Sequence, residues 1–370
     1  MKVKRKLLAL SLVLALVLSF ALTGCKAADK TPEDDNSTIT DSTNTPDDND
    51  TEATDLKVAM VTDEGGVNDQ SFNQSAWEGL QQAEKELGVT VKYQESHQEA
   101  DYAPNFETLL DAGNDLIWGI GYKLADAGLA AAEANPDTNY AIIDSEYGKN
   151  TPENMVGVLF KAEQPSFLVG YIAGRMTETN KIGFVGGIEG EVIGSFDYGF
   201  QAGVQYAAKE LGKEITVLSQ YADSFSDAAK GKSIATNMYQ QGMDVVFHAA
   251  GGVGDGVIEA AKEQDKWVIG VDRDQSDMAP ENVLTSAMKR VDVGVYNIVK
   301  ALKEGNFPGG TTVTYGLADN GAVDIAPTSD KHVPADILKT VEEIKQEIID
   351  GKIEVPANQE TYDAFVEGLK

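Results

Sequence analysis

Short apolar runs alternate with amphipathic stretches along the chain from about Leu56 onward. The apolar runs are rich in β-branched residues, as strands are, whereas the stretches between them repeat their apolar positions at helical spacing. Strands that alternate with helices form parallel sheets covered by helices. The pattern therefore predicts an α/β protein with strands at Lys57–Thr62, Thr90–Gln94, Leu116–Ile120, Tyr140–Ile143, Met155–Phe160, Lys181–Val185, Thr216–Gln220, Val245–Ala249 and Trp267–Val271.

Part of this pattern occurs twice, 124 positions apart. Gly79–Gly88 reads GLQQAEKELG and Gly203–Gly212 reads GVQYAAKELG, and a β-rich strand follows each copy. Because the surroundings match as well as the letters, the sequence indicates a duplicated α/β unit. Phe72 and Phe196 then hold equivalent places in the two copies.

The part of the chain after Leu56 is too long for one simple core and suits two domains of ordinary size. We expect a first domain at residues 56–160 plus 288–310 and a second at residues 161–287 plus 311–370. A helix at Met288–Glu304 would return the chain to the first domain, and Pro334–Asp350 would be a helix of the second. Two doubly wound parallel-sheet domains joined by several crossovers form a hinged cleft, which closes on a ligand.

The first 55 residues are not expected to fold with the rest. Met1–Gly24 has basic residues followed by an apolar run, as secretion signals do, and that run is shorter than the roughly 20 residues of a spanning helix. It ends in Leu-Thr-Gly-Cys, which resembles the bacterial lipobox, so Cys25 is the expected lipidation site. An ordinary cleaved signal and a short membrane anchor are the alternatives. The polar segment after Cys25, up to residue 55, is expected to be a disordered tether.

Composition excludes several classes of function. The formal net charge of −30 and the pI near 4.3 leave no basic surface to neutralise phosphates, so we expect no nucleic-acid partner. The single cysteine excludes a disulfide, and the three histidines are far apart, so we expect no metal site. No motif places a nucleophile beside a base. We therefore predict no catalytic residue and no cofactor. We also expect the protein to be a monomer.

The stretch from Lys57 to Leu80 is the strongest candidate for a binding site. It reads as a strand, a turn with two glycines, and a helix for which Ser71 or Asn73 is the expected N-cap. In open α/β sheets, the loop after a strand's carboxyl end lies over the ligand crevice. The residues expected to face a ligand here are Asp63, Asn68, Asp69, Ser71 and Phe72.

Other candidates come from later strand ends, and each has a purely structural alternative. Gly251 begins a glycine-rich turn that lacks the spacing of a dinucleotide or Walker motif, so we expect a close backbone approach to a ligand. Asp126 is either a helix-start acid or a ligand contact. Phe72 and Phe196 are either core residues or the two faces of a slot for a planar base. Asp272 follows a strand, and Lys289 lies near the crossover back to the first domain.

Several motifs together resemble one family. They are TDEGGVNDQSFN (Thr62–Asn73), SFLVGYIAG (Ser166–Gly174), KIGFVGG (Lys181–Gly187), HAAGGVGDGV (His248–Val257) and VIGVDRDQ (Val268–Gln275). The ordered set resembles the basic membrane protein (BMP) lipoproteins, which are purine-nucleoside receptors of ABC importers with a type I periplasmic-binding-protein-like fold. The resemblance covers nearly the whole chain after Leu56. Arg273 departs from it, since a smaller residue is expected there.

The resemblance implies a lipid-anchored receptor on the extracytoplasmic face of the cell membrane, with an ABC permease as its partner. It implies that aromatic rings hold the base of guanosine, inosine or adenosine, and that Asp272 and Lys289 hold the ribose. Asp63, Ser71, Phe72 and Asn73 match the family's first-domain motif, so the resemblance makes them ligand-binding residues as well. With Asp63, Asp126 and Asp272 against Lys289 as the one cation, the cleft is expected to be negative. A sugar receptor of the same architecture and a secreted nucleoside hydrolase are the alternatives.

Overall fold

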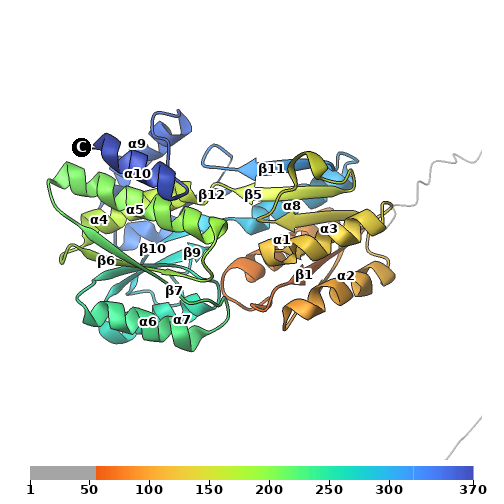
Figure 1. Cartoon of the computed structure of the whole chain (residues 1–370), viewed down its shortest axis with the longest axis horizontal. Helices are drawn as coiled ribbons and strands as arrows, with labels where there is room; N and C mark the ends of the chain where they lie inside the picture. The colour runs from red at the N-terminus through yellow and green to blue at the C-terminus, as the bar shows by residue number, and fades with distance from the viewer. Residues whose placement is uncertain (1–55, 320, 370) are drawn as a thin grey trace, which may run out of the picture. The chain divides into compact units, whose positions relative to one another are not determined.

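The computed structural model describes residues 56–319 and 321–369, so the signal sequence, Cys25 and the tether lie outside the described residues. The described residues belong to a single compact unit that contains two parallel-dominated sheets. Figure 1 shows the first sheet with its helices on the right and the second on the left, and we call these two halves lobe 1 and lobe 2. The expected α/β class with two doubly wound sheets is confirmed.

Lobe 1 contains a six-stranded sheet in the order β11-β5-β4-β3-β1-β2, and all its pairings are parallel. Its central strands are fully buried because helices cover both faces, which accounts for their nearly continuous apolar sequences. The strands are β1 (Lys57–Thr62), β2 (Thr90–Gln94), β3 (Leu116–Ile120), β4 (Asn139–Ile143), β5 (Met155–Phe160) and β11 (Thr311–Tyr315).

The helices of lobe 1 form one layer on each face of the sheet. Apolar residues of α1 and α8 pack on one face, and those of α2 and α3 pack on the other. The helices are α1 (Phe72–Leu87), α2 (Tyr102–Asp111), α3 (Ala125–Ala134) and α8 (Val291–Lys303), with short 3₁₀ turns at η1 (Glu99–Asp101), η2 (Tyr122–Leu124) and η3 (Gly148–Asn150).

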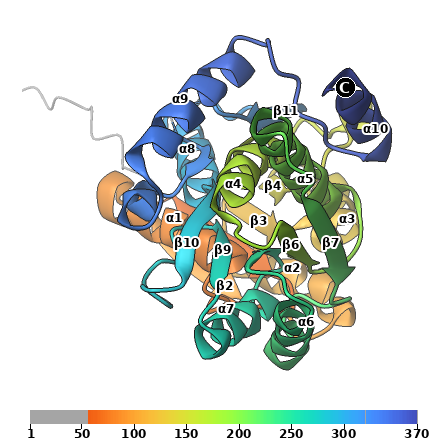
Figure 2. The same ribbon diagram turned by 90° about the vertical axis from the view of Figure 1, so that its left-hand side faces the viewer.

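Lobe 2 repeats this architecture with the order β12-β10-β9-β8-β6-β7, in which only β12 pairs antiparallel among the described strands. Figure 2 shows α6 and α7 on one side of the sheet and α4, α5 and α9 on the other. The strands are β6 (Lys181–Gly186), β7 (Thr216–Tyr221), β8 (Val245–Ala249), β9 (Trp267–Asp272), β10 (Val283–Lys289) and β12 (Val323–Ile325). The helices are α4 (Glu163–Met176), α5 (Glu191–Leu211), α6 (Ala228–Gln240), α7 (Val253–Gln264), α9 (Ala335–Ile349) and α10 (Gln359–Leu369), with a 3₁₀ turn at η4 (Pro327–Lys331).

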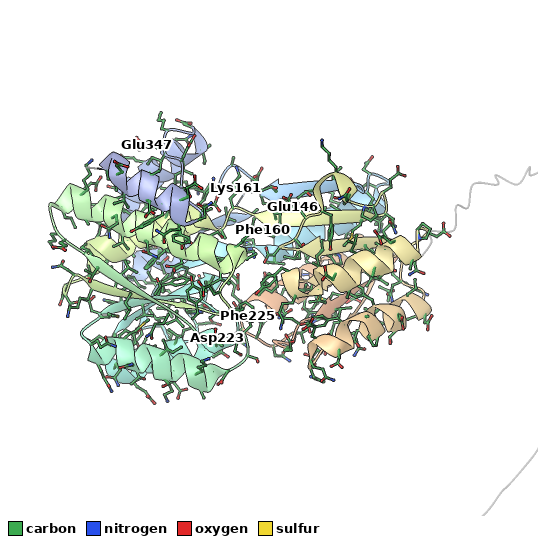
Figure 3. The ribbon with its side chains drawn as sticks, viewed as in Figure 1. Glu146, Phe160, Lys161, Asp223, Phe225 and Glu347 are labelled. Atoms are coloured by element: carbon green, nitrogen blue, oxygen red, sulfur yellow. The ribbon has the colours of Figure 1, made fainter. Side chains whose placement is uncertain are left out.

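Three connections in the described part of the chain join the lobes. They lie between β5 and α4, between β10 and α8, and between β11 and β12. Figure 3 shows Phe160 and Lys161 at the first of them. The amide of Lys161 donates a hydrogen bond to the carbonyl of Tyr315, the last residue of β11, after which the third connection begins. Neighbouring crossovers of this kind form a hinge.

The nine expected strands are all present, and two details of the expected organisation change. Residues 283–289 form β10, so the expected helix at Met288–Glu304 begins only at Val291. Thr311–Tyr315, which was assigned to the second domain, pairs with β5 in lobe 1. The β10 segment is buried on both faces, so its polar and apolar residues do not alternate, and Thr285 and Ser286 interrupt its apolar run. It therefore lacks both sequence patterns that indicate a strand.

The two copies of the repeated segment end in the same way. Helix α1 ends at Gly88 (φ 68°, ψ 35°) and α5 ends at Gly212 (φ 58°, ψ 34°), and both glycines are left-handed. Glycine adopts this conformation without steric cost, which is why it recurs at this position. The repeated letters therefore mark equivalent helix ends in the two lobes.

Candidate functional site

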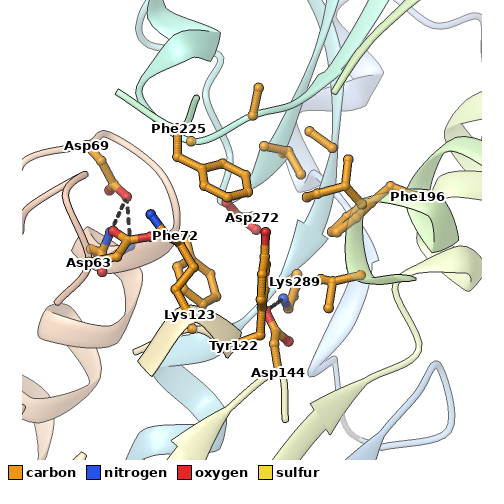
Figure 4. A pocket seen from close by; sticks show the side chains of 18 residues that line it. Asp63, Asp69, Phe72, Tyr122, Lys123, Asp144, Phe196, Phe225, Asp272 and Lys289 are labelled. Carbon is orange, nitrogen blue, oxygen red and sulfur yellow. Dashed lines mark hydrogen bonds and ion pairs between the residues drawn. The ribbon is translucent and has the colours of Figure 1, made fainter. Parts of the chain in front are cut away.

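The carboxyl ends of both sheets border one pocket between the lobes (Figure 4). The space between its walls amounts to about 550 Å³, part of which is open to solvent. Lobe 1 lines it with Asp63, Asp69, Phe72, Asn73, Gly121, Tyr122, Lys123 and Asp144, and lobe 2 with Val192, Ile193, Phe196, Phe225, Ala249, Ala250, Gly251, Val271, Asp272 and Lys289. This position, at the strand ends of an open α/β sheet, is where such folds bind ligands.

The turn between β1 and α1 is built on buried carboxylates. Asp63 accepts hydrogen bonds from the Gly65 amide at 2.9 Å and from Asn73 Nδ2 at 2.8 Å. Gly66 has a φ of 68°, which the tight turn requires and glycine permits. Burial, partly offset by these hydrogen bonds, raises the pKa of Asp63 to about 6. The side chain therefore titrates close to neutral pH.

Asp69 caps helix α1. Its carboxylate accepts hydrogen bonds from the amides of Ser71, Asn73 and Gln74 at 2.8–3.0 Å. Ser71 is the N-cap residue of the helix, as expected, but its side chain makes no capping hydrogen bond. The Ser71 hydroxyl instead donates to Asp272 of lobe 2.

Asp272 lies at the end of β9 in a left-handed conformation, with φ at 65°. Its side chain is buried next to Lys289 and accepts a hydrogen bond from the Ser71 hydroxyl. Burial raises the pKa of Asp272 to about 7, although the charge of Lys289 opposes this shift. A hydrogen bond that a ligand donates to this carboxylate would favour its charged form and lower its pKa.

Lys289 is 2% exposed and forms an ion pair with Asp144 of lobe 1. Asp144 follows β4 and is also left-handed, with φ at 62°. The ammonium group lies 4.8 Å from the ring centre of Phe72, 5.5 Å from that of Phe160 and 5.8 Å from that of Phe196. Cations are stabilised over aromatic faces, so the rings help to hold the charge in this buried position.

Aromatic rings form much of the remaining wall. Phe72 is partly buried, whereas Phe196 is 2% exposed and packs against Phe247 in the core of lobe 2. Tyr122 of lobe 1 meets Phe225 of lobe 2 edge to face, with ring centres 6.4 Å apart. Burial raises the pKa of Tyr122 to about 12, so its hydroxyl remains a hydrogen-bond donor.

The pocket brings together most of the residues that the sequence singled out. Those in its wall are Asp63, Asp69, Phe72, Asn73, Phe196, Gly251, Asp272 and Lys289. Asn68, which was also expected to face the ligand, is exposed and does not line the pocket. Ser71 lies behind the wall, bonded to Asp272. Asp126 is exposed in the first turn of α3 and does not line the pocket, which agrees with its alternative as a helix-start acid.

The sequence did not point to four charged or aromatic residues of the wall as site residues: Tyr122, Lys123, Asp144 and Phe225. The rule for strand ends would have found Asp144, since it directly follows the strand Asn139–Ile143. Phe225 lies in the loop after β7, where a single aromatic residue gives no distinctive pattern.

The wall carries four carboxylates and two lysines, so it is formally negative, as expected. The expectation of one cation was wrong because Lys123 also reaches the pocket. Its ammonium group pairs with Glu64 at 2.6 Å, outside the wall.

Arg273, at the position where the family resemblance predicts a smaller residue, does not line the pocket. Its side chain is directed at Gln70 and Glu78 of lobe 1.

The described residues contain neither a cluster suited to a metal ion nor a helix suited to span a membrane. No group of three or more His, Cys, Asp or Glu side chains in residues 56–319 and 321–369 is arranged to hold a metal ion. Among the helices of the same residues, none has the length and apolar character needed to cross a membrane.

The model of a known family, described as "ABC transporter substrate-binding protein PnrA-like" (Bmp), matches residues 56–359. A CD4+ T-cell-stimulating antigen from Listeria innocua is 43% identical, over 96% of this chain and 99% of that protein. An ABC transporter nucleoside-binding protein, BmpA, from Lactococcus lactis is 45% identical over 82% of this chain and 90% of that protein. Basic membrane protein A from Borreliella burgdorferi is 42% identical over 84% of this chain and 90% of that protein.

Solved structures agree with these relatives. A solute-binding protein of an ABC transporter system from Aeropyrum pernix superposes with a TM-score of 0.76 at 30% identity, over 85% of this chain and 97% of that one. An arabinose-binding protein from Geobacillus stearothermophilus, at 14% identity and a TM-score of 0.55, shares the fold. The resemblance to the BMP family is thus confirmed, and the chain belongs to the family of PnrA-like ABC transporter substrate-binding proteins.

Proposed function

We propose that this protein is a lipid-anchored receptor that captures a purine nucleoside between its lobes and delivers it to an ABC permease. One observation carries the proposal. Phe72 and Phe196, which hold equivalent places in the repeated unit, line the same pocket together with Asp272 and Lys289. A planar base and a polyhydroxylated sugar are the two chemical groups that such a wall suits, and a nucleoside contains both.

The base would stack against the aromatic wall. Base stacking on an aromatic side chain contributes roughly 1–3 kcal/mol, so two rings supply a large part of micromolar affinity. Asp63 and Asn73 would add polar contacts at the lobe 1 side. Asn73 uses its Nδ2 for Asp63 and Asp69, and its buried Oδ1 has no partner within the described part of the chain. That oxygen is available to accept a hydrogen bond from an N–H group of a base.

The ribose would lie at Asp272 and Lys289. The Asp272 carboxylate accepts hydrogen bonds from sugar hydroxyls, and the Lys289 ammonium donates to a ribose oxygen. Hydrogen bonds with one charged partner contribute about 1.5–3 kcal/mol each. The relative from Lactococcus lactis is called a nucleoside-binding protein, which supports the same ligand class for this chain.

The anchor and the permease belong to the same proposal. Cys25 in Leu-Thr-Gly-Cys would carry the lipid, and two or three acyl chains hold a protein stably at a membrane. The substitution Cys25→Ala is expected to release the protein from the membrane fraction. Unchanged membrane retention of Cys25→Ala after removal of Met1–Gly24 would contradict the anchor.

Isothermal titration with inosine, guanosine, adenosine, ribose and galactose tests the ligand class. We expect the purine nucleosides to bind and the free sugars not to bind at comparable concentrations. Binding of a sugar without a nucleoside would identify a sugar receptor of the same fold. Release of free base from inosine during incubation with the purified protein would identify a hydrolase.

A further inference from the structure

The segment Arg273–Gln275 reaches from lobe 2 to lobe 1 outside the pocket wall. Gln275 is fully buried, and its Nε2 donates a hydrogen bond of 3.0 Å to the carbonyl of Gln70 in the β1–α1 turn. Beside it, Arg273 Nη1 lies 3.4 Å from the side-chain oxygen of Gln70. Arg273 Nη2 lies 3.8 Å from the Glu78 carboxylate. None of these four residues lines the pocket.

Lobe 2 holds this segment firmly. The Oε1 of Gln275 accepts the Val271 amide at 2.9 Å, and the Gln275 amide donates to Ser286 Oγ at 3.2 Å. The Asp274 carboxylate accepts a hydrogen bond of 2.7 Å from the Thr328 hydroxyl. Gln275 therefore bonds its own lobe with its oxygen and the opposite lobe with its nitrogen.

Gln70, at the lobe 1 end of this contact, and Asp272, three residues before Gln275, both have an unusual backbone. Gln70 has a φ of 53° and Asp272 a φ of 65°, and side chains other than glycine seldom adopt this conformation. On the lobe 2 side, Gln275 accepts a hydrogen bond from the amide of Val271, the residue directly before Asp272. On the lobe 1 side, Gln70 directly precedes Ser71, whose hydroxyl donates to Asp272. The contact thus supports both halves of the Ser71–Asp272 pair.

We propose that Gln275, assisted by Arg273, clamps the closed lobes together and sets the rate at which a bound ligand leaves. The inference rests on the proposed function for its ligand but concerns residues that do not touch that ligand. Opening of the cleft breaks the Gln275–Gln70 bond and leaves a buried amide unpaired until water reaches it, which is costly. Differences in affinity among related complexes arise mainly in the dissociation rate, and a clamp acts on that rate.

Gln275→Glu separates the two bonds of this side chain. A carboxylate still accepts the Val271 amide, but it cannot donate to the Gln70 carbonyl. Gln275→Met keeps a side chain of similar length without the donor. Ser286→Ala is the matched control, because it loosens the same segment within lobe 2 without removing a bond to lobe 1.

Stopped-flow kinetics with inosine and small-angle scattering of the ligand-free full chain test the clamp. We expect Gln275→Glu and Gln275→Met to dissociate about tenfold faster, with association rates within about twofold of the wild type. Arg273→Ala is expected to dissociate only about twofold faster, because its side chain is partly exposed and its contacts are long. Ser286→Ala should dissociate at nearly the wild-type rate.

Scattering separates this inference from the proposed function. Ligand-free Gln275→Glu is expected to have a larger radius of gyration than the wild type, whether or not inosine is the ligand. Failure of the wild type to bind inosine would overturn the proposed function, and the clamp would then be judged by scattering alone. An unchanged radius of gyration in both Gln275 variants would overturn the clamp, as would equally fast dissociation of Ser286→Ala.

Discussion

The two lobes present equivalent turns to the pocket, and the chemistry of these turns differs. The position of Phe72 in lobe 1 corresponds to Phe196 in lobe 2, so the ring is common to both. Three places earlier, lobe 1 has Asp69, whereas lobe 2 has Ile193. The first is a buried, hydrogen-bonded carboxylate and the second is an apolar wall residue.

The difference arises from where the two helices begin. Helix α5 begins at Glu191, whereas the equivalent part of lobe 1 is a loop and α1 begins only at Phe72. Because α1 begins later, Asp69 lies just before the helix and accepts the amides of Ser71 and of Gln74 in the first helical turn. In lobe 2 the extra helical turn directs Val192 and Ile193 at the pocket. A duplicated unit can therefore provide one polar and one apolar wall around the same pair of rings.

The largest expected effect concerns the charge of this combined wall. Four carboxylates against two lysines, with Lys289 and Lys123 already paired, leave no free cation in the wall for a phosphate group. Burial of an unpaired charge is strongly unfavourable. Inosine or guanosine is therefore expected to bind at least about a hundredfold more tightly than its 5′-monophosphate in isothermal titration. Similar dissociation constants would contradict the charge argument.

The second effect concerns the contribution of Asp272 and Lys289, the charged residues of the lobe 2 wall, to the affinity for a nucleoside. Asp272→Ala or Lys289→Ala should each weaken nucleoside binding at least tenfold, since a hydrogen bond to a charged group contributes about 1.5–3 kcal/mol. Asp126→Ala is a suitable control, because this carboxylate is exposed in α3. Equal affinity of the Asp272 and Asp126 variants would remove Asp272 from the ribose site.

The third effect compares the two rings directly. Phe72→Ala and Phe196→Ala should each weaken nucleoside binding by roughly 1–3 kcal/mol. Only Phe196→Ala should also lower the Tm of the empty protein clearly, because Phe196 packs against Phe247 and large-to-small changes in a core leave a cavity. An unchanged affinity for either variant would show that its ring belongs to the core alone.

The smallest expected effect is the pH dependence of the empty protein. Burial raises the pKa of Asp272 to about 7, whereas an aspartate in an unfolded chain has a pKa near 3.9. Between these values the folded state binds more protons than the unfolded state, so this group lowers stability as the pH rises from about 4 to about 7. Asp272→Asn should flatten that part of a Tm profile against pH. A profile identical to the wild type would contradict the raised pKa.

The sequence predicted the fold well because its strands are short, apolar and separated by clear helical periods. It also predicted most of the wall, since Asp63, Asp272 and the turn at Gly251 all lie at or just after the carboxyl end of a strand. It did not predict that β11 adds to lobe 1, because a strand's partner depends on packing that distant parts of the chain decide. Nor did it show the direction of Arg273, which depends on how closely the lobes approach.

The central claim is that the pocket between the lobes holds a purine nucleoside, and mass spectrometry of the small molecule that copurifies with the protein tests it most directly. The account predicts the mass of inosine, guanosine or adenosine in the extract of the wild type. It also predicts a much weaker signal from Asp272→Ala, purified in parallel as the control. A sugar in the wild-type extract, or equal amounts of nucleoside from both proteins, would contradict the account.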